Sequence, residues 1–132
     1  MMFIRQKVCK TFLVGLILSI GIVSYEGLAE ARTLTVGSGQ MYSTIQAGID
    51  VAVTSDTVLV SAGSYVENIN FLGKGISVVS VSGAATTIID GNGSGSVVTF
   101  GSGEGNNSVL QGFTIRNGKC AIMIFNHSAG DI

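Results

Sequence analysis

The chain has no proline among its 132 residues, which is unusual for a sequence so rich in turns. Its 19 glycines, with repeated Asn-Gly and Ser-Gly pairs, separate short apolar runs. Glycine and asparagine tolerate the positive φ values of sharp turns, whereas proline holds φ at about −65°. We therefore expect glycine and asparagine to make every corner of the fold.

Cysteine is also scarce. Cys9 lies in an N-terminal segment that we expect to be removed, which leaves Cys120 alone. A single thiol cannot form an internal disulfide. Two interpretations of Cys120 stay open: a small apolar residue packed beside Ala121, or a thiol available for intermolecular pairing.

Charge and histidine are scarce as well, and both absences limit function. Charged residues make up 11% of the chain, and the part after residue 31 has four basic and six acidic side chains. No basic patch is present, so we expect no binding to nucleic acid. The one histidine, His127, has no Ser, Cys or carboxylate close to it in the pattern of a catalytic group.

The N-terminus has the pattern of a signal peptide. Three basic residues precede an uncharged, mostly apolar run from residue 11 to residue 25, and Ala29-Glu30-Ala31 follows. The alternative is a membrane anchor, but this run is shorter than the roughly 20 residues that a spanning helix needs. We expect residues 1–31 to be cleaved before Arg32. Residues 32–132 are then secreted, periplasmic or at the cell surface, with no stable membrane span.

A strand over residues 32–36 and one helix are expected next. Ser43 and Gln46 match a capping box at the start of the helix. An apolar stripe follows at Ile45, Ile49 and Ala52. Gly48 costs about 1 kcal/mol relative to alanine inside a helix, so this helix needs tertiary packing. A single amphipathic helix ahead of many β runs is typical of the cap on a solenoid.

From Asp56 onward, short Val/Ile runs alternate with Gly/Ser/Asn turns. Similar positions recur at a nearly constant interval, in the pairs Ile69/Ile88, Val60/Val81 and Val79/Val98. A period of roughly 20 residues indicates stacked coils, and the Leu-x-x-Leu-x-Leu frame of leucine-rich repeats is missing. We predict an all-β fold: a right-handed parallel β-helix of about four coils behind the capping helix.

Several segments resemble the opening of right-handed parallel β-helix proteins of the pectin lyase-like superfamily. They are Tyr42–Asp50, Asp56–Val60, Gly63–Ile69, Thr87–Gly95 and Gly112–Gly118. The resemblance implies the fold, but it leaves activity open. The superfamily contains pectate lyases, pectin methylesterases, polygalacturonases, epimerases and non-catalytic surface proteins. The chain departs from the pattern at Ala62, where the family usually has proline, and after Lys119, where further coils are usual.

A candidate calcium site lies at Asp90, Asn92 and Ser94. These residues supply oxygens at positions 1, 3 and 5 of a calcium-loop pattern, but Gly101 stands where a bidentate Glu is required. The alternative is a β-helix corner, because Asp, Asn and Gly make turns and cap backbone groups. Asn92, Asn107 and Asn117 are also candidates for a stack of side-chain amides along a corner. We expect no bound cofactor, with calcium at this loop as the open alternative.

Glu67, Asp90 and Arg116 are the candidate catalytic residues. The resemblance implies this role, since pectate lyases use clustered carboxylates for calcium and an arginine as base. Glu67 and Asp90 are expected on successive coils, and Arg116 is the strand-borne arginine. Two alternatives stay open: scattered acids on a solvated face, and a Glu67 that bonds to nearby backbone.

We expect the chain to be the N-terminal portion of an exported β-helix protein, related to polysaccharide-processing or surface-binding proteins and not catalytic by itself. The alternatives are a carbohydrate-active enzyme on acidic polysaccharide, similar to a pectate lyase or a pectin esterase, and an adhesion or structural module. Expected partners are a polysaccharide and a second copy. Self-association is expected through the last strand, Ala121 to Phe125, whose edge lacks a cap.

Overall fold

The computed structural model describes residues 30–124. Almost all of the expected signal peptide, and His127, lie outside these residues. One short helix and ten strands are present in the described part. In chain order they are β1 (Thr33–Val36), α2 (Ile45–Val51), β2 (Thr57–Val60), β3 (Gly63–Val66), β4 (Ile69–Asn70), β5 (Ser77–Ser80), β6 (Thr87–Asp90), β7 (Ser96–Phe100), β8 (Val109–Gln111), β9 (Thr114–Arg116) and β10 (Cys120–Ile124).

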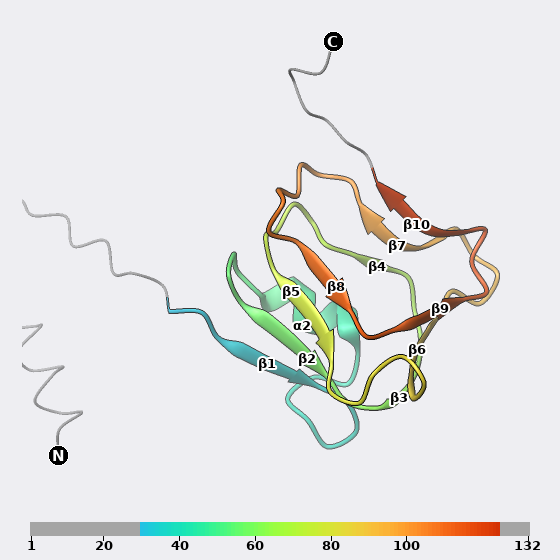
Figure 1. Ribbon diagram of the computed structural model, residues 1–132, viewed down its shortest axis with the longest axis horizontal. Coiled ribbons are helices and arrows are strands. Elements are labelled where there is room, and N and C mark those ends of the chain that lie inside the picture. Colours follow the sequence, from blue (N-terminus) through green and yellow to red (C-terminus); the bar gives the residue numbers. More distant parts are fainter. Residues whose placement is uncertain (1–29, 125–132) are drawn as a thin grey trace, which may run out of the picture. The chain divides into compact units, whose positions relative to one another are not determined.

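The strands wind into a parallel β-solenoid of about four turns (Figure 1). They form three sheets, with strand orders β1-β2-β5-β8, β3-β6-β9 and β4-β7-β10. Every pairing between strands is parallel, and strands pair with those of the neighbouring coils. The predicted fold class, a parallel β-helix behind one short helix, is confirmed.

The coils are less regular than the sequence period predicts. In the four-stranded sheet, Thr33, Thr57, Ser77 and Val109 share one row. The chain between neighbours in this row is shortest from Thr57 to Ser77 and longest from Ser77 to Val109. The recurrences at Ile69/Ile88, Val60/Val81 and Val79/Val98 do not coincide with strand pairings, because Ile69 pairs with Val98, Val60 with Ser80 and Val79 with Gln111. Corner loops of different lengths cause this irregular spacing. The longest loop of the later coils separates β7 from β8.

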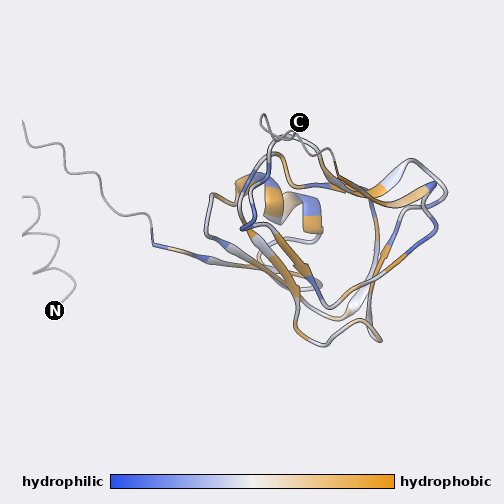
Figure 2. Cartoon of the chain, turned by 45° about the horizontal axis from the view of Figure 1, so that its top comes forward, coloured by the Kyte–Doolittle hydropathy of each residue, from blue (hydrophilic) through white to orange (hydrophobic). Residues whose placement is uncertain are grey.

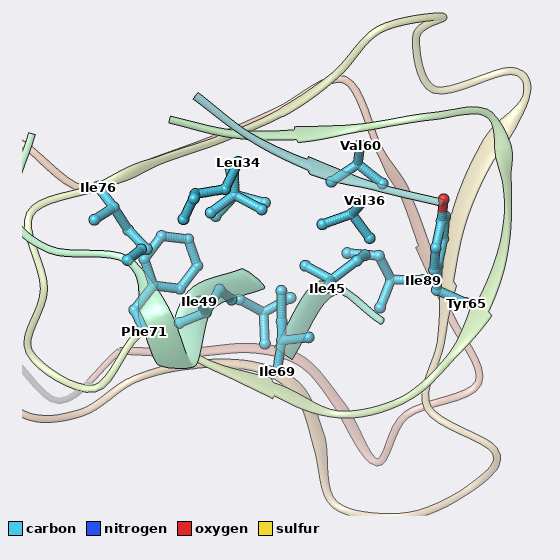
Figure 3. Close-up of a cluster of buried hydrophobic side chains, with 14 of the residues drawn as sticks. Leu34, Val36, Ile45, Ile49, Val60, Tyr65, Ile69, Phe71, Ile76 and Ile89 are labelled. Carbon is cyan, nitrogen blue, oxygen red and sulfur yellow. The ribbon is translucent and has the colours of Figure 1, made fainter. Parts of the chain in front are cut away.

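The interior of the solenoid is a continuous apolar core. Side chains alternate between this core and the surface along the strands, as at Val58 and Val60 of β2, which are fully buried. Figure 2 shows apolar positions on all three walls, and Figure 3 shows core side chains pointing toward one another from opposite walls. Stacking these side chains coil upon coil supplies the burial that such short strands need.

Helix α2 packs its apolar stripe on this core. Ile45, Ile49 and Ala52 are buried, as predicted. Gly48 is explained by the close approach of the helix to the sheet, since a Cβ there would lie 3.0 Å from methyl groups of both Val36 and Val58. No helix of the described residues is long and apolar enough to cross a membrane.

The predicted capping box at Ser43 is wrong by one residue. The helix begins at Ile45, and Thr44 is its N-cap, with an extended backbone and a hydroxyl that accepts a hydrogen bond from the N–H of Ala47 at 3.2 Å. Gln46 does not reach back to the cap. Its side-chain amide instead bonds to the backbone of Asn70 in β4, through both its oxygen and its nitrogen.

Candidate functional site

Asp90 and Arg116 come together where β6 and β9 end. The parallel register places the two residues side by side, and Arg116 Nε donates to Asp90 Oδ2 at 2.9 Å. The two side chains form an ion pair in which Asp90 is 12% exposed and Arg116 is 51% exposed. Two of the three candidate catalytic residues are therefore neighbours.

The carboxylate of Asp90 is surrounded by hydrogen-bond donors. Its Oδ1 accepts from the backbone N–H of Asn92, and its Oδ2 also accepts from the Asn117 side-chain amide, both at 2.9 Å. The Asn92 N–H and the Arg116 guanidinium lower the pKa of Asp90 below its ordinary value. Asp90 therefore stays ionised at neutral pH and acts as an acceptor that holds the corner together.

The backbone of Glu67 lies beside that of Asp90 on the next coil, but the Glu67 carboxylate bonds to helix α2. The N–H of Glu67 donates to the carbonyl of Asp90 at 3.0 Å. The carboxylate oxygens accept from the backbone N–H groups of Ile45 at 2.8 Å and Gln46 at 2.9 Å, in the first turn of α2. The structure thus assigns the Glu67 carboxylate to the start of the helix and does not join it to the Asp90–Arg116 pair.

The three calcium candidates form a tight turn between β6 and β7. Asn92 has φ +50°, and the N–H of Ser94 bonds to the carbonyl of Gly91 at 2.9 Å. The side-chain amide of Asn68, one coil earlier, donates to the carbonyl of Ser94. Among the described residues, no group of three or more His, Cys, Asp or Glu side chains is placed to hold a metal.

This geometry favours the turn over a calcium loop. Calcium takes six to eight oxygen ligands, usually with more than one carboxylate. Asp90 is the only carboxylate of the loop, and its two oxygens already accept from three donors.

Two Asn-Gly pairs stack at this corner on successive coils. The N–H of Gly93 donates to the carbonyl of Asn117 at 2.6 Å, and both Asn92 and Asn117 have left-handed backbone conformations. The two asparagines thus occupy equivalent turn positions on successive coils, and the Asn117 side-chain amide bonds to Asp90. Asn107 does not share this position, because it lies on the loop between β7 and β8. The recurrence of the Asn-Gly pair on successive coils is the sequence signal for this corner.

A shallow pocket lies on the corner, and we refer to this surface as the polar corner. It has a volume of about 420 Å³ and opens widely to solvent. Its lining residues are Asn92, Gly93, Asn117, Gly118 and Lys119. The sequence singled out neither Lys119 nor the pocket, because both depend on how the β6–β7 and β9–β10 turns stack.

The polar corner presents amides and positive charge. Among the described residues, the Lys119 ammonium makes no ion pair or hydrogen bond, and Arg116 bonds to Asp90 through Nε alone. Amides bond to hydroxyl groups, and a guanidinium or an ammonium attracts carboxylates. The surface is suited to a hydroxylated, negatively charged ligand.

Comparison of the chain with protein-family models, with characterised proteins and with solved structures found no match. The function is therefore argued from the fold and from this corner.

Proposed function

We propose that the chain is a non-catalytic β-solenoid module of an exported protein, and that its polar corner contacts an acidic polysaccharide. The observation that carries the proposal is the corner itself, where Asn92, Asn117 and Lys119 line one pocket and the half-exposed Arg116 directly precedes Asn117 in the chain. These groups match the hydroxyls and carboxylates of a uronate-containing chain.

The engagement of the candidate catalytic groups supports a non-catalytic role. In a pectate lyase-like site the carboxylates would hold calcium, and a metal-binding carboxylate must be free to meet the ion. The Glu67 carboxylate bonds to two N–H groups of α2, and the Asp90 carboxylate bonds to three donors. Both acids stabilise the scaffold. The likeness of several segments to pectin lyase-like proteins agrees with a polysaccharide partner.

Affinity electrophoresis through gels that contain polygalacturonate tests the proposal. We expect the protein to be retarded in these gels but not in gels that contain neutral dextran. Lys119→Gln removes one exposed charge at the pocket and should weaken binding by about threefold to tenfold, given the strength of hydrogen bonds to charged groups.

Ser38→Asp is the matched control, because it lowers the net charge by the same amount on an exposed loop between β1 and α2. It should bind like the wild type. Equal retardation of the wild type and Lys119→Gln, or an equal loss in both variants, contradicts a binding site at the polar corner.

A further inference from the structure

Asp56 is a buried carboxylate that the proposed function does not use. Only 1% of the residue is exposed, and it lies immediately before β2. Its oxygens accept four hydrogen bonds, one from the backbone N–H of Val53 at 3.0 Å and three from Arg32. A buried carboxylate needs such compensation, and most of it comes from a single residue.

The contact with the backbone of Arg32 is the informative one. The backbone nitrogen of Arg32 lies 2.8 Å from Asp56 Oδ1, while its guanidinium bonds to Oδ2 through Nη2 at 2.7 Å and Nε at 3.2 Å. Arg32 is also the residue before which the Ala29-Glu30-Ala31 pattern predicts cleavage. Residues 30–32 are exposed and have no regular secondary structure, so a peptidase can reach this bond.

We propose that the Ala31–Arg32 bond is a proteolytic processing site, and that Asp56 binds the α-ammonium group that cleavage creates on Arg32. An endopeptidase of the signal peptidase class adds water across the amide. The C–N bond breaks, Ala31 keeps a carboxylate, and the new amine of Arg32 takes up a proton. The neutral N–H···O contact becomes a charge-assisted bond at the same position.

The position of the cut matters for this interaction. Cleavage one residue earlier leaves the charge on Ala31, beyond Asp56. Cleavage one residue later removes Arg32 and, with it, three of the four donors to Asp56. Cleavage before Arg32 therefore strengthens the contact that joins the start of β1 to the start of β2. In this way one carboxylate, that of Asp56, links export of the protein to folding of the solenoid.

The α-ammonium should show this contact in its titration. An N-terminal amine ordinarily has a pKa of about 7.7–8.0, and an opposite charge within hydrogen-bond distance raises such a value by about one unit or more. The guanidinium of Arg32 is a like charge that acts in the opposite direction, and Asp56, which is closer to the amine and buried, outweighs it. The Tyr42 phenol is a further titratable group near the Arg32 guanidinium.

The test starts from the full chain, expressed with its N-terminus in a secreting bacterial host. Intact mass and N-terminal sequencing identify the cleavage site, and an NMR pH titration of the processed protein follows the Arg32 amine. Asp56→Asn removes the proposed acceptor. Asp50→Asn is the matched control, since it removes an exposed acid from α2.

We expect a product that begins at Arg32, with a raised amine pKa in the wild type and Asp50→Asn and an ordinary one in Asp56→Asn. If Asp56→Asn does not fold, acetylation of the Arg32 amine replaces it and should lower the melting temperature below pH 8, with the difference fading at higher pH. A product that begins elsewhere, or a wild-type amine with an ordinary pKa, overturns the proposal.

Discussion

At the residue scale, several charged side chains of the described residues bond to backbone groups of neighbouring coils. The two ends of α2 illustrate this. Glu67 accepts from the N–H groups of the first turn, and Lys74 Nζ donates to the carbonyls of Ile49 and Asp50 at the last turn. Each charge has the sign that the helix dipole favours at that end. The short helix is held in place by the coil that follows it.

Removal of the Glu67 charge should destabilise the fold. Glu67→Gln keeps the shape of the side chain but replaces one of its two acceptor oxygens with an NH₂ group that faces an N–H donor. We expect a loss of about 1–2 kcal/mol in the free energy of unfolding, measured by urea denaturation. Val66→Thr, at an exposed neighbouring position of β3, should change stability by less than about 0.5 kcal/mol. Equal losses in the two variants would show that the Glu67 contacts to α2 contribute nothing specific.

The acid limb of the stability profile should depend on Asp56. The side-chain and backbone hydrogen bonds from Arg32 and Val53 hold the pKa of Asp56 far below its ordinary value. A carboxylate with a lowered pKa contributes stability that is present above its unfolded pKa of about 4 and is lost as pH falls below it. Urea midpoints should therefore drop between pH 5 and pH 2. Asp56→Asn should have a lower midpoint at pH 7 and a flatter acid limb, and an unchanged acid limb would assign the effect to other groups.

At the element scale, the two sides of the solenoid differ. On the N-terminal side, α2 packs against β1, β2 and β4, and the Gln46 amide bonds to both the N–H and the C=O of Asn70 as the peptide group of a neighbouring strand would. On the other side, β8, β9 and β10 each pair with one strand only among the described residues. Helix α2 covers the edge on the N-terminal side, and covering an edge with a helix is one of the ways in which β proteins prevent the addition of a further strand.

The last coil should be the least protected part of the solenoid and the site of self-association. We expect amide hydrogen exchange to be slow in β2 and β5, which lie between two strands, and faster in β8 and β10. Ile122 of β10 is 42% exposed, and Ile122→Lys should reduce the dimer detected by sedimentation of the processed protein. Met41→Lys, at an exposed position of the loop before α2, is the control. A monomeric wild type with slow exchange throughout β10 contradicts this prediction.

At the scale of the whole molecule, the sequence predicts what depends on local pattern and misses what depends on stacking. The apolar stripe of α2 and the short Val/Ile strands follow from the periodicities of helices and strands, so the fold class was predictable. The partner of Ile69 and the lengths of the coils were not, because corner loops of variable length set the register. The sequence left open a Glu67 that bonds to backbone, but it could not identify the partners, Ile45 and Gln46, because they lie one coil earlier in the chain.

The polar corner shows the same division. Asp90 and Asn92 were recognisable as turn residues, and a turn is what they form. The ion pair with Arg116 and the pocket beside Lys119 exist only because β6 and β9 lie in register. The candidate residues were thus identifiable from the sequence, whereas their engagement with the scaffold was visible only in three dimensions.

We propose that the acids of this solenoid are structural and that its polar corner binds a ligand without catalysing a reaction. The most direct measurement is the near-ultraviolet absorbance of unsaturated uronates, recorded while the purified protein is incubated with polygalacturonate and calcium. We expect no increase above the protein-free rate, in a sample that is retarded in polygalacturonate gels. A steady increase in absorbance that disappears in Arg116→Ala would contradict the proposal and would make Arg116 a catalytic residue.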